Sequence, residues 1–301
     1  DVDDSSLLES LRGFKEPLHS GTTMTTISIP KTFLKYRDIY KHHPPGTIAS
    51  PATSSSAPAP EAKPPSCGAS PDFTDFFSLN GNHRSVNKED QKLYQRFFQD
   101  PWEKEHFRGN YVELGAFQGL AESNSRFFES CLGWNGLLIE GNERNFEKLV
   151  VNRPNAHRMN FAPSCEREGG TTKFHKSGGS TSGVEGRAKT FDGRDDAVEL
   201  PCGPLTPVLQ EVFGDRPHID FFSLDVEGAE DLILATIDFD LVQIDVFMIE
   251  VENNFCKKYD KCEVRSRVRE QMDGLGYKRY EHMVRKSDVY VHPKSPFQLP
   301  W

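Results

Sequence analysis

The chain has 301 residues, of which 36% are hydrophobic, and it carries a net charge of −9. This length allows one large domain or two ordinary ones. The acidic balance gives the protein no electrostatic reason to bind nucleic acid, so we predict no nucleic-acid partner. No stretch reaches the roughly 18 apolar residues of a membrane-spanning helix. No signal peptide is recognisable, but a chain that begins at Asp1 is expected to be a processed product or a fragment that has lost an anchor or signal.

Residues 1–84 are predicted to form a flexible tail or stem. The segment from His42 to Pro71 is rich in Pro, Ser and Ala and has almost no large apolar residues. Such a segment cannot bury enough surface to offset its ordering entropy, so we expect an extended linker with polyproline character. Order is expected to begin near Ser85, and residues 85–301 are predicted to form one domain.

The remainder alternates between helix and strand patterns. Apolar spacing over residues 85–102 predicts a helix that ends at Pro101. Strands are then expected at 110–114, 135–140, 156–162, 219–225, 246–252, 277–283 and 287–292, and helices at 123–133, 142–154, 205–213, 229–237 and 263–276. The Gly-rich stretch from Pro163 to Pro204 is expected to be irregular, with an edge strand at 172–175. The order predicts an α/β fold with a seven-stranded, mostly parallel sheet covered by helices on both faces, and an antiparallel final pair.

Acidic residues recur where the predicted strands end. Glu113 ends the first strand and Glu140 the second, Asp225 ends the strand at 219–225, and Glu250 and Glu252 end the next one. Ligands of open parallel sheets bind at the carboxyl ends of the strands. We therefore interpret these acids as the walls of one crevice.

The first two strand ends indicate a nucleoside site. Glu140 lies 21 residues after Gly119, the spacing at which a second-strand acid meets a ribose diol. The turn is G-x-x-x-G rather than G-x-G-x-x-G, and a negative Glu113 suits a ligand with a sulfonium or ammonium better than a pyrophosphate. This favours S-adenosylmethionine over NAD. The alternatives are a bare strand–helix turn and a helix-capping role for Glu140.

The predicted cofactor-binding residues are Glu113, Gly115, Ala116, Gly119, Glu140, Gly141, Asn142 and Asp225.

Asp225 and Glu227 are the candidate catalytic residues. They flank one apolar residue, so on an extended backbone they would point the same way, as base and positioning group or as metal ligands. In the alternative, Glu227 and Glu230 only complement a helix dipole. His175 and His218 are weaker candidates for the base, and Cys165 is a candidate thiol near the site.

Six cysteines allow three disulfides in fifteen connectivities, or six buried thiols. Cys256 and Cys262 could close a small loop. Because no C-x-x-C pair or His/Cys cluster occurs, we predict no zinc site and no other metal site.

The segments "YVELGAFQG", "WNGLLIEGNERNFEKL", "IDFFSLDVEGAEDLIL" and "FMIEVE" resemble the FkbM-type methyltransferase domain, most closely its eukaryotic, Star-like branch. The resemblance covers about residues 90–292 and implies a class I, Rossmann-like fold. It also implies S-adenosylmethionine-dependent O-methylation of a small-molecule or glycan acceptor. By position, Glu113, Gly115 and Gly119 would match the cofactor loop, Glu140 the ribose acid and Asp225 the acid beside the methyl group.

Two other functions remain open from the sequence: a non-catalytic, membrane-tethered trafficking or binding protein that keeps this fold, and an NAD enzyme. The Pro-rich tail resembles the stem of a tethered lumenal enzyme of the secretory pathway, with a cytoplasmic location as the alternative. The absence of an Asn-x-Ser/Thr sequon weakens the lumenal assignment.

Overall fold

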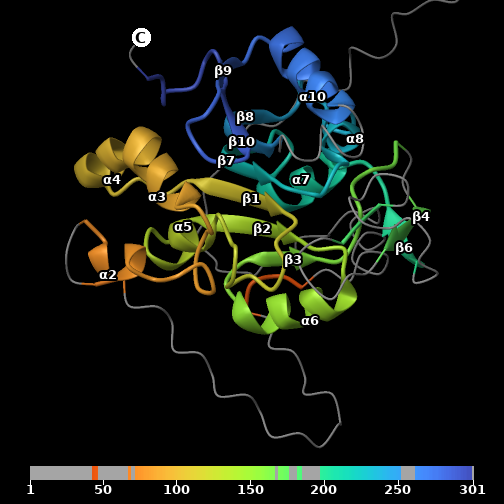
Figure 1. Cartoon of the computed structure of the whole chain (residues 1–301), viewed down its shortest axis with the longest axis horizontal. Coiled ribbons are helices and arrows are strands. Elements are labelled where there is room, and N and C mark those ends of the chain that lie inside the picture. The colour runs from red at the N-terminus through yellow and green to blue at the C-terminus, as the bar shows by residue number, and fades with distance from the viewer. Residues whose placement is uncertain are drawn as a thin grey trace, which may run out of the picture.

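The computed structural model describes residues 43–46, 67–68, 72–166, 169–175, 182–184, 197–251 and 262–299. These residues form a seven-stranded sheet in the order β3-β2-β1-β7-β8-β10-β9, and a separate three-stranded sheet in the order β5-β4-β6 (Figure 1). The strands of the main sheet are β1 (Asn110–Leu114), β2 (Asn135–Ile139), β3 (His157–Met159), β7 (His218–Leu224), β8 (Gln243–Glu250), β9 (Lys278–Tyr280) and β10 (Ser287–Val291). All seven predicted strands are present.

The strand order reverses between β1 and β7. From β1 the chain builds outward through β2 to β3, and it then returns to place β7 on the other side of β1, followed by β8. These five strands are parallel. β10 pairs antiparallel with both β8 and β9, which confirms the predicted antiparallel pair.

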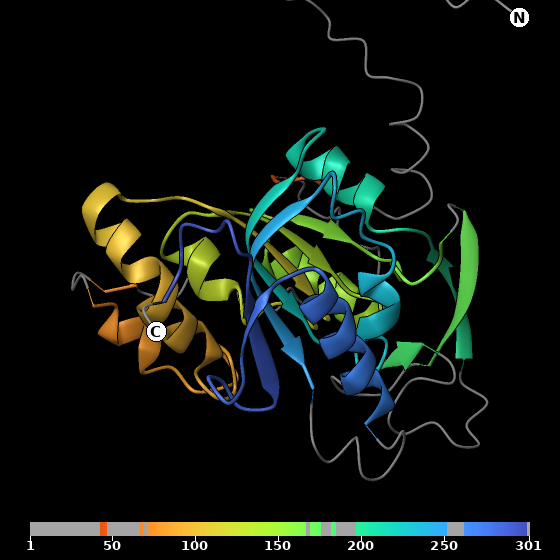
Figure 2. The ribbon, with the colours of Figure 1, turned by 90° about the horizontal axis from the view of Figure 1, so that it is seen from above.

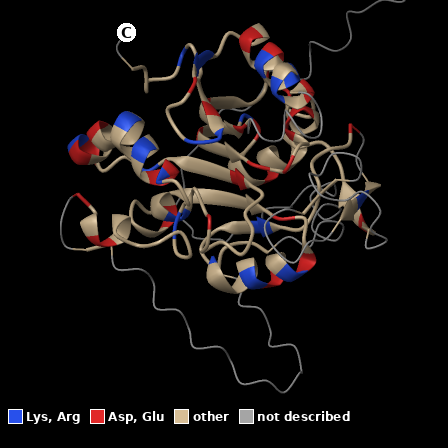
Figure 3. Cartoon of the chain, viewed as in Figure 1, with Lys and Arg blue, Asp and Glu red and all other residues tan. Residues whose placement is uncertain are grey.

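Helices cover both faces of the sheet, as predicted (Figure 2). On one face, α7 (Thr206–Phe213), α8 (Glu230–Leu234) and α10 (Glu263–Gly274) pack in one hydrophobic cluster with Val112. On the other face, α2 (Thr74–Phe77), α3 (Glu89–Leu93), α5 (Arg126–Ser130) and α6 (Glu143–Asn152) pack with Tyr111. Neighbouring residues of β1 thus point to opposite faces. Charged residues lie mainly on the outer helices α4, α6 and α10, and the central strands carry few (Figure 3).

The helical region before β1 begins and ends later than predicted. α3 continues into a π-helical turn, Tyr94–Phe98, and then into α4 (Gln99–Glu105), so Pro101 does not end the helix. Because α4 begins at Gln99, Pro101 lies in its first turn. It follows the π-helical turn, in which the amide of Gln99 donates to the carbonyl of Tyr94 five residues earlier.

Ordered packing begins earlier than Ser85. Phe73 and Phe76 are buried and contact the ring of Phe127, with centroids 5.1 and 5.3 Å away. A disulfide also joins Cys67 to Cys131. These aromatic residues therefore belong to the domain core, although they precede the boundary expected from the sequence. Most of the predicted tail lies outside the described residues, and no helix within the described residues is long and apolar enough to cross a membrane.

The stretch expected to be irregular contains the second sheet: β4 (Gly170–His175), β5 (Gly183–Val184) and β6 (Ala197–Cys202), paired antiparallel. The expected edge strand at 172–175 is part of β4, whereas β6 was not predicted. A disulfide between Cys165 and Cys202 fastens this sheet to the segment that follows β3. Cys256, and with it the expected Cys256–Cys262 loop, lies outside the described residues.

Candidate cofactor and acceptor site

The crevice at the carboxyl ends of the strands begins where β1 and β7 meet. Gly115 has a φ of 80°, and a Cβ at this position would lie 1.8 Å from the carbonyl oxygen of Asp225. The amide of Asp225 donates a hydrogen bond to Leu114 O at 3.2 Å. Only glycine fits this close approach. The junction coincides with the reversal of strand order, where open α/β sheets bind their ligands.

A narrow cavity of about 50 Å³ lies on the β2 side of this junction. Its walls are mainly apolar and include Ile139, Phe161, Ala162 and Ile233. The three-stranded sheet closes it with Phe174, whose ring lies so close to Gly141 that a Cβ there would be 2.6 Å away. The apolar lining of this slot is of the kind that contacts the faces of a purine base.

Glu140 is one of two carboxylates that line this narrow cavity in the described part of the chain, and Asp225 is the other. Its Oε1 accepts from the amide of Asn142 at 2.7 Å, and its Oε2 accepts from the amide of Phe117 at 2.8 Å. Burial raises the pKa of Glu140 to about 7, and the two amides oppose this shift. Each oxygen retains a second lone pair. Glu140 can therefore accept hydrogen bonds from a diol that enters the cavity.

A larger cavity of about 420 Å³ lies on the other side of the junction. It shares Leu114, Gly115 and Asp225 with the narrow cavity, so the two adjoin. Its charged lining consists of six acids and two bases: Glu89, Glu113, Glu122, Asp225, Glu227, Glu250, Arg285 and Lys286. This excess of carboxylates makes the larger cavity unfavourable for an anionic ligand.

The loop after β7, which carries Asp225 and Glu227, contains a strained turn. Glu227 has a φ of 60° and Gly228 a φ of 107°, so the backbone is not extended there, contrary to the premise of the sequence analysis. Asp225 and Glu227 nevertheless line the same cavity. Oε1 of Glu230 accepts from the amides of Val226 and Gly228, both at 3.1 Å, and so fixes the turn. Burial and the nearby Glu250 raise the pKa of Glu230 to about 7.

Glu113 lies at the wall of the larger cavity but is held by the protein. Its carboxylate accepts from the hydroxyls of Ser123 and Ser125 and from the amide of Asn124, at 2.5 to 2.8 Å. Burial raises its pKa, and the neighbouring Arg153 opposes this. These contacts fix the loop that follows Gly119, so Glu113 organises the crevice in addition to lining it.

Comparison with protein families identifies the domain. Residues 113–279 match the Methyltransferase FkbM domain. The chain belongs to the FkbM methyltransferase family. The match covers more than half of the chain and includes the carboxyl ends of β1 and β7. It confirms the resemblance found in the sequence. The Star-like branch stays a prediction.

Two solved structures align with parts of this FkbM chain. The fibrillarin of Aeropyrum pernix in complex with natively bound S-adenosyl-L-methionine aligns at 11% identity and a TM-score of 0.34, over 60% of this chain and 65% of its own. The chain thus spans slightly less than two thirds of that fibrillarin. A SAM-dependent methyltransferase from Aquifex aeolicus aligns at 10% identity and a TM-score of 0.31, over 67% and 92%. No curated protein matches the chain.

The FkbM domain brings most of the predicted residues together. Glu113, Gly115 and Asp225 line the larger cavity, and Gly115, Glu140, Gly141 and Asp225 line the narrow one. Among the described residues, neither cavity is lined by Ala116, Gly119 or Asn142.

These three residues stabilise the backbone around the crevice without lining it. Ala116 donates its amide to Ile139 O at 3.1 Å. A Cβ at Gly119 would lie 2.6 Å from side-chain atoms of Leu149 and Arg153. Asn142 caps α6, because its side chain accepts from the amide of Arg144.

The weaker candidates lie elsewhere. His218 begins β7, at the edge of the sheet opposite to Asp225, so it is not a base of this crevice. Cys165 is bonded to Cys202 and is not a thiol. His175 is buried in β4 and is not among the lining residues of either cavity.

Sequence reasoning missed many lining residues, including Glu89, Glu122, Arg285 and Lys286 of the larger cavity and two groups in the narrow one. Phe161 and Ala162 follow β3, so the strand-end rule applied to the third strand could have found them. Phe174, Ser182 and Val184 come from the second sheet, and no sequence signal connects them to the crevice.

The chemistry of these residues fits S-adenosylmethionine, the cofactor expected from the sequence and from the FkbM family. An apolar slot suits adenine, Glu140 suits the ribose diol, and the carboxylates beyond Gly115 suit a positively charged amino-acid portion. A pyrophosphate would meet the same carboxylates, which disfavours NAD.

Proposed function

We propose that the protein is an S-adenosylmethionine-dependent O-methyltransferase whose acceptor is a neutral or cationic hydroxyl compound, either a small molecule or a glycan. One observation carries this proposal: Asp225 lies in the wall shared by the narrow apolar cavity beside Glu140 and the larger acidic cavity. A group at this junction is placed to act on an acceptor oxygen beside the cofactor.

The cofactor would occupy the narrow cavity and the junction. Glu140 would accept hydrogen bonds from the ribose, and Gly115 would permit close approach of the backbone. When bound, S-adenosylmethionine supplies an activated methyl group. The protein then has to position an acceptor hydroxyl and remove its proton.

Asp225 and Glu227 are the groups that would receive this proton. Both line the larger cavity, and Asp225 also lines the junction. The strained turn at Glu227 and Gly228 supports a functional role, because such conformations persist where the surroundings impose them.

The charge of the larger cavity supports the acceptor class. One oxygen each of Asp225, Glu230 and Glu250 lies within 4.8 Å of the others, and among the described residues Arg285 and Lys286 are the only bases that line the cavity. A carboxylated, sulfated or phosphorylated acceptor would meet repulsion here, whereas a polyol or an amine would not.

The two disulfides, Cys67–Cys131 and Cys165–Cys202, support a location in the lumen of the secretory pathway. Disulfides persist in oxidising compartments and are reduced in the cytosol. Mass spectrometry of the protein from secretory and cytosolic fractions, with free thiols alkylated, tests this assignment: reduced cysteines in the native fraction would contradict it.

Calorimetry with S-adenosylhomocysteine tests the cofactor site. The wild-type chain should bind it, Glu140→Ala should weaken binding at least tenfold, and Glu147→Ala, a change at an exposed position of α6, should not. NAD should not bind. If neither ligand binds the wild type, the non-catalytic scaffold function replaces this proposal. If the wild type binds S-adenosylhomocysteine and Glu140→Ala binds it equally well, the position assigned to the ribose is wrong.

Transfer of a labelled methyl group to panels of hydroxyl compounds tests the acceptor. Neutral and cationic polyols should be labelled, and Asp225→Asn should lower the rate more than it lowers cofactor affinity. Labelling confined to anionic acceptors would contradict the acceptor class and leave the methyltransferase assignment intact.

A further inference from the structure

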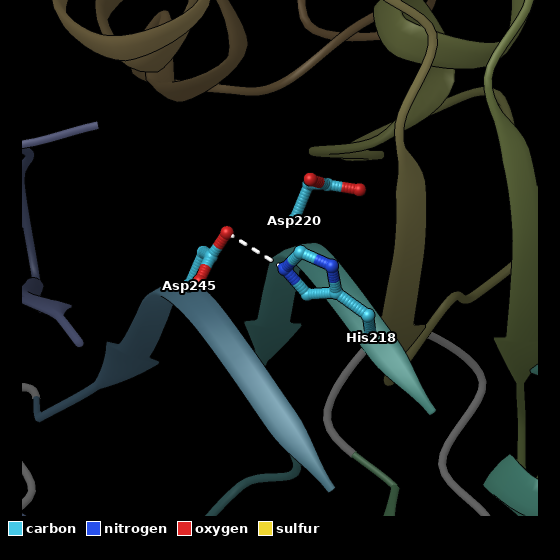
Figure 4. Close-up of side chains that lie close together, drawn as sticks. All are labelled: His218, Asp220 and Asp245. Carbon is cyan, nitrogen blue, oxygen red and sulfur yellow. Dashed lines mark hydrogen bonds and ion pairs between the residues drawn. The ribbon is translucent and has the colours of Figure 1, made fainter. Parts of the chain in front are cut away.

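A second cluster of ionisable groups lies where β7 and β8 begin, at the ends of these strands opposite to the crevice. One ring nitrogen of His218 and one carboxylate oxygen each of Asp220 and Asp245 lie within 4.8 Å of one another. His218 Nε2 is 2.8 Å from Asp245 Oδ2, and the carboxylate of Asp220 lies beside this pair (Figure 4). The cluster begins β7 and β8, whereas Asp225 follows the far end of β7. Four residues of β7 lie between Asp220 and Asp225, so the two are about 17 Å apart along the strand.

The parallel register of β7 and β8 assembles this cluster. His218 pairs with Gln243, and Ile219 with Ile244, so Asp220 and Asp245 occupy adjacent positions on neighbouring strands. Two contacts hold the carboxylates: Asp220 Oδ2 accepts from the amide of Asn110 at 2.7 Å, and Asp245 Oδ1 accepts from Gln243 Nε2 at 2.9 Å. The three side chains are therefore positioned by the sheet itself.

The charges of the cluster do not balance within the protein. Asp245 is fully buried and Asp220 is 6% exposed, so two carboxylates lie close together with little water around them. His218 is the one basic group of the cluster, and a protonated imidazole would neutralise only one of the two carboxylates. A divalent cation with a neutral imidazole would neutralise both.

We propose that His218, Asp220 and Asp245 form a binding site for a divalent transition metal, with zinc as the expected ion. Imidazole and carboxylate are both zinc ligands, and three protein ligands leave a position for water. His218 gives solvent access, because about half of its side chain is exposed. Binding releases the proton from Nε2, which then coordinates the metal. Tetrahedral ligands lie roughly 3.3 Å apart, so small side-chain rotations would complete the site. The metal would link the amino-terminal ends of β7 and β8 and would thereby stabilise the sheet.

Zinc uptake by the full-length chain tests the proposal. The chain is first stripped with a chelator, and zinc is then titrated calorimetrically in parallel with thermal unfolding. The wild type should take up one ion with micromolar or tighter affinity, and the ion should raise its unfolding temperature. His218→Gln and Asp245→Asn should each weaken binding at least tenfold and abolish the thermal shift. His83→Gln, which changes an exposed histidine far from the cluster in sequence, should bind as the wild type does.

Cobalt substitution gives an independent readout, because visible absorption reports a tetrahedral Co²⁺ site and does not depend on enzyme activity. If Asp245→Asn does not fold, the half-exposed His218→Gln still decides the question. The proposal is overturned if the wild type takes up no zinc at millimolar concentration, or if His218→Gln and His83→Gln bind zinc equally well.

Discussion

Gly115 and Asp225 meet at the reversal of strand order: the backbone of one approaches the carbonyl of the other so closely that no side chain fits between them. This contact brings the end of β1 to the end of β7. It makes Asp225 part of two cavities, one beside Glu140 and one beside Glu227 and Glu250. A loop glycine therefore determines where the acids of separate strands converge.

Gly115→Ala should destabilise the domain severely. The substitution combines a positive φ with a Cβ 1.8 Å from a backbone oxygen, so we expect a loss on the order of 3 kcal/mol or more. Thermal unfolding measures this loss. Gly274→Ala in α10, where a Cβ would meet no atom within 4 Å, is the control and should change stability by about 1 kcal/mol or less. Equal unfolding temperatures for the two variants would contradict the role of Gly115.

Cofactor affinity should depend on pH through Glu140. Its pKa is raised to about 7, and the ionised form is the better acceptor for ribose hydroxyls. Affinity for S-adenosylhomocysteine should therefore rise about tenfold between pH 6 and pH 8. In Glu140→Gln it should be nearly independent of pH and, at pH 8, about 10-fold to 100-fold weaker than in the wild type.

The same group affects stability in the opposite direction. The folded state holds the Glu140 proton more tightly than the unfolded state, whose pKa is near 4.5. The stabilising contribution is thus present at low pH and is lost as the pH rises through about 7. The wild type should lose more stability than Glu140→Gln between pH 5 and pH 8 in denaturant titrations. A pH profile shared by both proteins would show that Glu140 ionises normally.

The two disulfides should have different effects on cofactor binding. They span 37 and 64 residues, and each is expected to contribute roughly 4 kcal/mol by restricting the unfolded chain. Replacing Cys165 and Cys202 by Ser should lower both the unfolding temperature and the affinity for S-adenosylhomocysteine, because this bond fastens the sheet that carries Phe174. Replacing Cys67 and Cys131 should lower the unfolding temperature alone. Equal losses of affinity would contradict the role of the second sheet as a pocket wall.

Arg153 should be essential for stability. Its guanidinium is buried, pairs with Glu129 at 2.9 Å, and donates to Tyr111 Oη at 2.9 Å. Arg153→Met would leave the Glu129 carboxylate buried without its partner, which costs about 3–5 kcal/mol. Lys104→Met breaks the exposed pair with Asp100 and should leave the free energy of unfolding nearly unchanged. Denaturant unfolding compares the two variants.

The sheet was predictable because its strands are near-continuous apolar runs with acids at their ends. Glu140 and Asp225 both follow such runs, and the parallel sheet brings their ends to one edge. The second sheet was not predictable in the same way. β6 contains Pro201 and alternates weakly, and its pairing with β4 depends on contacts distant in sequence, including the bond from Cys202 to Cys165.

The roles of individual site residues were harder to predict than their positions. Gly119 was expected to face the cofactor, but Leu149 and Arg153 fill the space beside it. His218 and Asp245 are 27 residues apart, and only the register of β7 against β8 brings them together. Spacing along the chain identifies strand ends, whereas side-chain neighbours across strands depend on register.

The position of β10 has a consequence for how this protein can be shortened. A polypeptide trimmed to the family match, residues 113–279, would end before Ser287–Val291, the strand inserted between β8 and β9. β9 would be cut within its three residues and would lose its partner, an edge of β8 would be bare, and the cluster around Phe98 would lose Phe297. We therefore expect a stably folded fragment to extend past both ends of the family match, from the vicinity of Cys67 to about Leu299.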